Sequence, residues 1–217
     1  MTLRLHRKGR FRAWLGGRFG GDADLGDRIW RRVLHGLCAI VLLYYLLPEN
    51  FFLIAPKWVI LLAALAAVLF LEVLRHAAGL ELPTIRAYEQ RRIASFAFFA
   101  VALVIAVLLF PMPVGAAVVL GTALVDPLAG ELRTYRARPT VQWGAPIAAY
   151  FALAWVGLAV VGRWPAIPSV ALALIAAPVA IVVERRMGTW LDDDLLMTLV
   201  PALLLLGLGV YALHLPA

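Results

Sequence analysis

Long apolar runs separated by short polar breaks dominate the pattern of hydrophobic and polar positions along this chain. Seven such runs, rich in Leu, Ala and Val, fall at 33–48, 51–74, 93–110, 112–130, 145–162, 166–184 and 195–215. A helix needs about 20 apolar residues to cross the hydrocarbon layer of a membrane. Each run is near this length, although the first and the third are short. The pattern therefore predicts an all-α bundle of about seven transmembrane helices.

The composition indicates that the outer surface of the folded chain faces lipid and not water. Of the 217 residues, 64% are hydrophobic and 15% are charged, whereas soluble domains contain roughly 45–50% apolar residues. So few polar groups cannot cover the surface of a soluble domain of this size. The apolar runs are continuous, and they lack the alternation typical of a transmembrane β-barrel. We therefore expect a multi-pass integral membrane protein.

Basic residues are distributed unevenly between the segments that join the predicted spans. All but two of the 20 Lys and Arg residues fall in the N-terminal segment and in every second loop after it, the exceptions being Lys57 and Arg163. Because Lys and Arg are enriched in cytoplasmic loops, this distribution predicts a cytoplasmic N-terminus and a C-terminus outside. A bacterial-type cytoplasmic membrane is the expected location.

The chain divides into a basic arm over residues 1–32 and a single transmembrane domain over residues 33–217. Basic residues in the arm are interleaved with apolar and aromatic ones, which is typical of a segment that lies on anionic lipids at the cytoplasmic surface. Basic residues that flank apolar spans also account for the net charge of +7. Since no RNA-binding module is visible, nucleic acid is not an expected partner.

Three carboxylates lie within the apolar runs. Glu72, Asp126 and Glu184 fall near the predicted cytoplasmic ends of the second, fourth and sixth spans. A lone carboxylate in the bilayer costs about 2.5–3.5 kcal/mol even on the lenient insertion scale, so we expect these side chains to face the bundle interior. Their common depth predicts a shared polar site near the cytoplasmic surface.

Three consecutive acids, Asp192, Asp193 and Asp194, directly precede the last predicted span. One aspartate at this position can cap the helix, because the helix dipole favours negative charge at its N-terminus. Three in a row indicate a hard cation such as Mg²⁺, which is usually held by one or two carboxylates together with substrate phosphates. Asp126, which is followed by Pro127 and small residues, is a further candidate metal ligand.

Four short motifs follow one another along the chain. They are Arg31-Arg32-x-x-His35, Glu72-x-x-Arg75, Asp126-Pro127-x-Ala129, and Glu184 followed after seven residues by Asp192-Asp193-Asp194-Leu195. In their order and spacing these motifs resemble those of the membrane family of dolichol kinases, phytol kinases and CTP-dependent diacylglycerol kinases.

The resemblance implies a lipid-alcohol kinase that transfers a phosphoryl group from a nucleotide, CTP in that family, to a polyprenol, a phytol-like alcohol or diacylglycerol. It implies Mg²⁺ held by Asp126 and Asp192–Asp194, with His35 or Asp126 as the acceptor of the hydroxyl proton. The nucleotide or the lipid would be bound by the remaining candidate residues, namely Arg31, Arg32, Glu72, Arg75, Ala129, Arg133 and Glu184.

The chain departs from the family pattern in three places. Val125 stands where the family has Gly, Asp194 stands where it has Asn, and residues 140–144 lack the Lys and Glu of the family's Lys-Ser-x-Glu-Gly element. These departures leave open a catalytically degenerate membrane scaffold of the same family. The other alternative is an ion- or proton-coupled transporter or flippase, which is expected to place its acids at mid-depth between internal repeats.

Overall fold

The protein is described by a computed structural model that covers residues 23–51, 55–79, 92–186 and 192–214. Its elements, in chain order, are α2 (Ala23–Leu37), η1 (Cys38–Leu46), β1 (Asn50–Phe51), β2 (Ala55–Pro56), α3 (Lys57–Ala78), α4 (Ser95–Leu109), α5 (Met112–Thr134), α6 (Pro139–Trp155), η3 (Val156–Val161), α7 (Ala166–Arg186), α8 (Asp193–Leu205) and η4 (Leu206–Ala212). The two strands form one antiparallel pair, and the fold is otherwise helical. The all-α prediction is confirmed.

Five of the described helical segments are long and apolar enough to cross a membrane. They are Lys57–Ala78, Met112–Thr134, Pro139–Val161, Ala166–Arg185 and Asp193–Val210. Two shorter apolar helices, Arg32–Leu46 and Ser95–Leu109, coincide with the first and third predicted runs, which are also short in the sequence. The chain is therefore an integral membrane protein with an all-helical fold.

Three helices begin or end a few residues away from the ends of the predicted apolar runs, because hydropathy marks the membrane and not the ends of helices. The second run was expected to begin at 51, but the strand pair occupies this region and α3 begins after Pro56. At the other end of the bundle α5 continues past 130 to Thr134, since a helix outside lipid can carry polar side chains. Likewise α6 begins at Pro139 and not at 145, and proline is well suited to the first turn of a helix.

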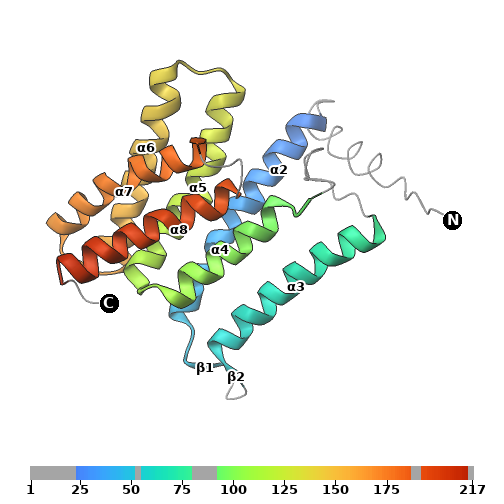
Figure 1. The fold of residues 1–217 in the computed structure, drawn as a ribbon, viewed down its shortest axis with the longest axis horizontal. Coiled ribbons are helices and arrows are strands. Elements are labelled where there is room, and N and C mark those ends of the chain that lie inside the picture. The colour runs from blue at the N-terminus through green and yellow to red at the C-terminus, as the bar shows by residue number, and fades with distance from the viewer. Residues whose placement is uncertain (1–22, 52–54, 80–91, 187–191, 215–217) are drawn as a thin grey trace.

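Helix α5 is the centre of the bundle. It contacts α2, α4, α6 and α8, whereas α3 lies at one edge and packs mainly on α4 (Figure 1). Small residues allow close approach between α5 and the continuation of α6. A Cβ atom added to Gly157 would lie 2.4 Å from the Cα atom of Ala117. Packing of this kind is typical of membrane helices, in which van der Waals contact replaces the hydrophobic effect between neighbours.

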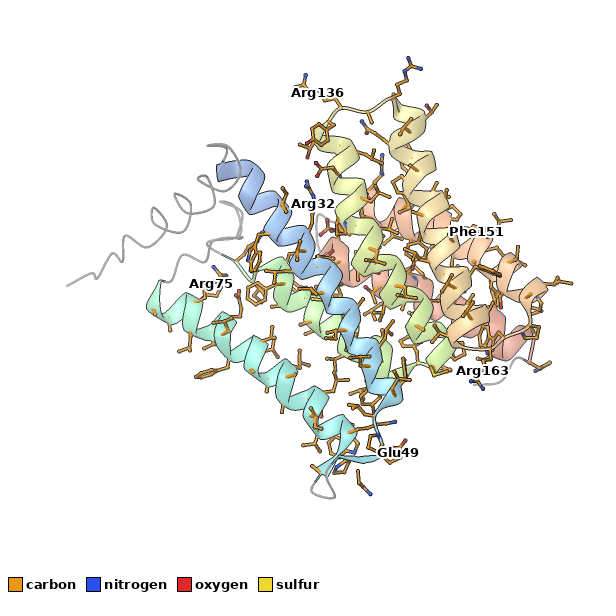
Figure 2. All side chains as sticks on the ribbon, turned by 180° about the vertical axis from the view of Figure 1, so that it is seen from behind. Arg32, Glu49, Arg75, Arg136, Phe151 and Arg163 are labelled. Carbon is orange, nitrogen blue, oxygen red and sulfur yellow. The ribbon has the colours of Figure 1, made fainter. Side chains whose placement is uncertain are left out.

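Charged side chains gather at the two ends of the bundle. We define the polar end as the end at which α3, α5 and α7 finish and α6 and α8 begin. Arg32, Arg75 and Arg136 lie toward the polar end, and Glu49 and Arg163 lie toward the opposite end (Figure 2). At that opposite end Glu49 forms an ion pair of 2.8 Å with Lys57, the first residue of α3. The apolar length of the bundle therefore separates two charged surfaces.

Candidate functional site

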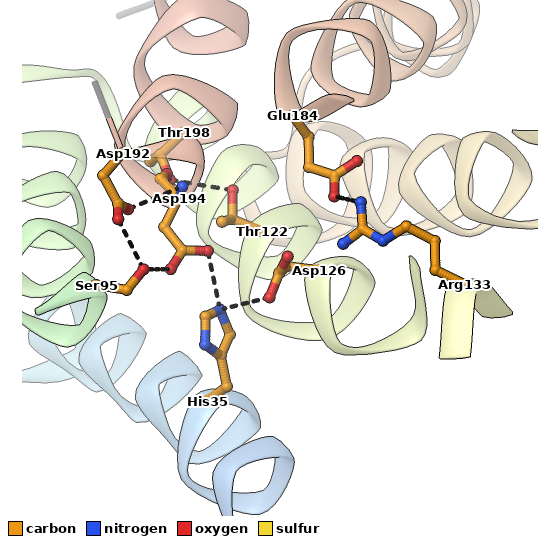
Figure 3. A network of polar contacts seen from close by, with 9 residues as sticks. All are labelled: His35, Ser95, Thr122, Asp126, Arg133, Glu184, Asp192, Asp194 and Thr198. Carbon is orange, nitrogen blue, oxygen red and sulfur yellow. Dashed lines mark hydrogen bonds and ion pairs between the residues drawn. The ribbon is translucent and has the colours of Figure 1, made fainter. Parts of the chain in front are cut away.

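Side chains from four helices meet around His35 near the polar end (Figure 3). The Nε2 atom of His35, in α2, lies 3.8 Å from Oδ2 of Asp126 in α5 and 3.7 Å from Oδ1 of Asp194 in α8. The ring stacks on Phe99 of α4, with centroids 4.0 Å apart and planes at 12°. Stacking holds the plane of the imidazole, so its nitrogen edge faces both carboxylates.

The three consecutive aspartates are placed by the start of α8. Asp192 is the N-cap residue, and its Oδ1 atom accepts a hydrogen bond of 3.1 Å from the backbone N–H of Asp194. Asp193 and Asp194 occupy the first turn, where the helix dipole stabilises negative charge. Burial raises the pKa of Asp192 to about 6, a hydrogen bond from Ser95 opposes this shift, and the charge of Asp193 adds to it.

Ser95, the first residue of α4, links two of these carboxylates. Its hydroxyl oxygen lies 2.8 Å from Oδ2 of Asp192 and 2.9 Å from Oδ2 of Asp194. A serine hydroxyl has only one proton to donate. Ser95 therefore either shares this proton between the two carboxylates in a three-centre hydrogen bond or accepts a proton from one of them.

A buried pair of threonines sets the register between α5 and α8. The hydroxyl oxygens of Thr122 and Thr198 lie 3.1 Å apart, and the Thr198 hydroxyl donates to the carbonyl oxygen of Asp194 at 2.8 Å. Asp126 follows Thr122 by four residues and Asp194 precedes Thr198 by four, so each acid shares a helix face with its threonine. Contact between the threonines thereby places Asp126 and Asp194 on facing helix surfaces.

Glu184 of α7 adds a carboxylate beside the same cluster. Its side chain is 1% exposed, and its Oε1 atom forms an ion pair with Arg133 of α5. The Oε2 atom has no hydrogen-bond partner, and Nε of Arg185 lies 3.8 Å from it. The Arg185 guanidinium itself stacks over the ring of Trp143 at 4.1 Å and donates to the carbonyl of Gln142. Glu184 thus retains one buried oxygen that can accept a ligand.

Three overlapping groups of these residues offer ligand atoms that lie within 4.8 Å of one another. The groups are His35–Asp126–Asp194, Asp126–Glu184–Asp193 and Asp192–Asp193–Asp194. Each group shares a residue with another, so the three positions are adjacent. Carboxylate oxygens are the hard donors that Mg²⁺ prefers. This donor set, with the single Ser95 proton between two carboxylates, fits a divalent cation.

Glu72 and Arg75, which were predicted to bind substrate, form an ion pair with each other. Glu72 was also predicted to share the site of Asp126 and Glu184, but it belongs to none of the three groups. Arg75 donates to both Glu72 carboxylate oxygens, from Nε at 2.8 Å and from Nη2 at 2.6 Å. The pair belongs to the contact between α3 and α4.

The other predicted residues have the following places. Arg32 forms an ion pair with Glu131 of α5, so these two charges neutralise each other beside the site. Ala129 is fully buried on α5, one turn beyond Asp126. The side chain of Arg31 and the arm over residues 1–22 lie outside the described residues.

Sequence reasoning did not single out several polar residues of this region, namely Ser95, Thr122, Thr198, Trp143 and Arg185. For the two threonines a signal existed, because each lies one helical turn from an acid within an apolar run. Ser95 lies near the beginning of the third apolar run, where a serine marks the start of a helix. Its link to the aspartates joins residues almost 100 positions apart, and no local pattern indicates it.

Comparison with protein-family models, with curated proteins and with solved structures finds no match for this chain. Any functional assignment therefore rests on its own residues.

Proposed function

We propose that the chain is a membrane-embedded lipid-alcohol kinase. It would transfer the γ-phosphoryl group of a nucleotide to a polyprenol, a phytol-like alcohol or diacylglycerol, with CTP as the donor by the motif resemblance given above. The observation that carries the proposal is the meeting of His35, Asp126 and Asp194 from three helices at one end of a membrane bundle. Such a site combines a potential proton acceptor with carboxylates that suit a phosphate-bound cation.

In this proposal the polar end faces the cytoplasm, where nucleotides are found. The chain crosses the membrane seven times, with the shorter Arg32–Leu46 and Ser95–Leu109 helices as two of the spans. The bias of Lys and Arg toward alternate loops supports a cytoplasmic N-terminus and an outside C-terminus. A bacterial-type cytoplasmic membrane fits this orientation, and the basic arm over residues 1–32 would contact its anionic lipids.

The aspartates would hold the cation and the triphosphate together. Asp126 and Asp192–Asp194 are the proposed ligands of Mg²⁺, which when bound offsets the negative charge on a nucleotide's phosphates. Glu184 lies at the same cluster, and its ion pair holds Arg133 beside it. A guanidinium held in this way matches the geometry of phosphate oxygens, so Arg133 is the proposed phosphate contact.

The transfer itself needs a positioned hydroxyl and an acceptor for its proton. The alcohol oxygen forms a bond to the γ-phosphorus while the bond from that phosphorus to the β–γ bridging oxygen breaks, which leaves CDP and a lipid phosphate. His35 is the proposed proton acceptor, because Asp126 belongs to two of the three potential ligand groups and His35 to only one. Phe99 orients the imidazole by stacking.

The assay uses purified protein in lipid with γ-labelled CTP, Mg²⁺ and candidate alcohols, and it counts label that enters the organic phase. Wild type should label lipid, and Asp126→Asn and Asp193→Asn should each reduce this label at least 100-fold, in the range of about 10²–10³ known for loss of one preorganised electrostatic contact. Glu49→Gln is a matched control, since it also neutralises an acid but at the opposite end of the bundle. It should retain wild-type labelling.

Each contrary result has its own meaning. Labelling that survives both aspartate substitutions would refute the site. Absence of labelling with every nucleotide and alcohol would refute the kinase and favour a degenerate scaffold or a transporter. A transporter is separated from a scaffold by ion or proton flux in sealed vesicles.

A further inference from the structure

The buried residues of helix α3 are both charged. Of its 22 residues, all of which are described, only Glu72 and Arg75 are buried. Its apolar side chains are exposed or half-buried, as expected of a helix whose main neighbour is lipid. Buried charges carry a desolvation cost that only good geometry and further hydrogen bonds can offset. The contacts of this pair therefore indicate what α3 does for the rest of the bundle.

The Arg75 guanidinium has several protein partners. Besides the two bonds to Glu72, its Nη2 atom donates to the backbone carbonyl of Arg92 at 2.7 Å. The Arg75 side chain is 3% exposed. It is therefore enclosed between α3 and the segment that leads into α4.

Glu72 accepts a hydrogen bond from the backbone of the segment that leads into α4. Its Oε1 atom accepts the backbone N–H of Ala94 at 2.8 Å. Ala94 is the N-cap residue of α4, and the first turn of α4 contains no acidic residue of its own. Glu72 therefore supplies, from another helix, the negative charge that a helix N-terminus favours.

The next residue along the chain is Ser95, whose hydroxyl contacts both Asp192 and Asp194. Hydrogen bonds and the backbone of residues 92–95 thus link the Glu72–Arg75 pair to two carboxylates of the site. The first part of this link fixes where α4 begins. Its last part fixes the two aspartates relative to each other, since both lie within 3 Å of one hydroxyl oxygen.

We propose that Glu72 and Arg75 are positioning residues that hold the start of α4 and, through Ser95, set Asp192 and Asp194 for cation binding. This inference rests on the proposed function, because it takes the aspartates as cation ligands. It gives the Glu72-x-x-Arg75 motif a role that needs no contact with nucleotide or lipid.

The test is the affinity for Mn²⁺ alone, measured by electron paramagnetic resonance on the full chain in lipid nanodiscs without nucleotide or alcohol. Glu72→Ala and Ser95→Ala should each weaken Mn²⁺ binding about tenfold, as is usual when a residue that orients a metal ligand is lost. Glu72→Gln should fall between Glu72→Ala and wild type, because its amide oxygen can still accept the Ala94 N–H. The double variant Glu72→Ala/Ser95→Ala should be no more than about twofold weaker than Ser95→Ala, since both act along one path.

Two further variants separate positioning from general stability. Glu49→Ala breaks the ion pair at the other end of α3 and should leave Mn²⁺ affinity unchanged. Arg75→Lys keeps the charge, loses the two-point contact and should bind Mn²⁺ with intermediate affinity. It also serves in place of Glu72→Ala if that variant does not fold, as judged by circular dichroism.

Three results would overturn the positioning role. They are unchanged Mn²⁺ affinity in the Glu72 and Arg75 variants, independent effects of Glu72→Ala and Ser95→Ala, and wild-type protein that binds no Mn²⁺. A raised KM for CTP with unchanged Mn²⁺ affinity would instead assign the pair to nucleotide binding. If the Mn²⁺ affinities of the variants follow the expected order but no lipid is phosphorylated, the proposed kinase function is refuted and the positioning role is supported.

Discussion

Polar residues of the candidate site are stabilised by partners on other helices. His35 lies one turn inside an apolar helix. Its Nε2 atom lies near carboxylates of α5 and α8, and its ring stacks on Phe99. Asp194 has Ser95 on one side and His35 on the other. Because an unpaired charge in lipid is costly, each of these residues limits where its neighbours can lie. The site is therefore also a structural contact between helices.

The raised pKa of Asp192 leads to a prediction about stability and pH. Its folded-state pKa is about 6 against a reference value of 3.8, so the folded protein binds this proton more tightly than the unfolded chain does. The stabilisation that comes from the tighter proton binding of Asp192 is thus fully present below pH 4 and is lost as the pH rises toward 6. Above pH 6 the free energy of unfolding no longer changes through this group. We expect Asp192→Asn, in detergent with a chelator, to remove roughly 1–2 kcal/mol of this decline, after allowance for solvent screening.

Thermal unfolding of wild type and variant between pH 4 and pH 8 measures this difference. Asparagine is also a good N-cap residue, so the variant retains the start of α8. Identical pH profiles for the two proteins would show that Asp192 titrates normally in the folded state.

At the scale of elements, small residues decide how closely the helices pack. Helix α5 approaches α6 and its continuation η3 through Gly121, against the ring of Tyr150, and through contact of Ala117 with Gly157. The neighbour of Gly157 is backbone, which cannot rotate away as a flexible side chain can. This packing places α6 against α5, and the same α6 carries Trp143 beneath Arg185.

Gly157→Ala should therefore destabilise the protein by about 1–3 kcal/mol, the usual cost of overpacking a core. Gly144 on α6 is the matched control, since a Cβ atom there would meet nothing within 4 Å. Gly144→Ala should be neutral or stabilising by up to about 1 kcal/mol, because alanine favours helix more than glycine does. Unfolding in detergent with increasing dodecyl sulfate compares the two. Equal stabilities would contradict the close contact between α5 and η3.

At the scale of the whole molecule, the chain has two charged surfaces separated by apolar helices. Arg136 lies in the connection from α5 to α6 toward the polar end, and Arg163 lies in the connection from η3 to α7 toward the opposite end (Figure 2). Both are exposed. These two positions report on the orientation proposed above.

We expect Arg136→Cys to react with a membrane-impermeant thiol reagent only in inside-out vesicles, and Arg163→Cys to react only in intact cells. Both variants are made with Cys38→Ser, since Cys38 is the single cysteine of the chain. Labelling after detergent treatment provides the control for reactivity. The reverse pattern would place the aspartates outside, where no nucleotide is supplied, and would remove the basis of the kinase.

Local sequence was enough to predict the membrane-helical class, the approximate positions of the helices and the grouping of acids near helix ends. These features depend on hydropathy and charge summed over local segments, which the chain shows without any knowledge of contacts. Even the two shorter helices are visible as short apolar runs. The ends of α3, α5 and α6 differ from the ends of the apolar runs, because a helix can continue beyond the hydrocarbon layer or begin after a proline.

Which of the acids lie close together depends on how the helices pack. The depth of Glu72 resembles that of Asp126 and Glu184 in the sequence, yet Glu72 faces Arg75 and the start of α4, while the other two join the aspartates of α8. Depth follows from position along a helix, but partners follow from how each helix is rotated about its axis and which helix lies beside it. Those quantities are set by packing between distant segments, and no single segment encodes them.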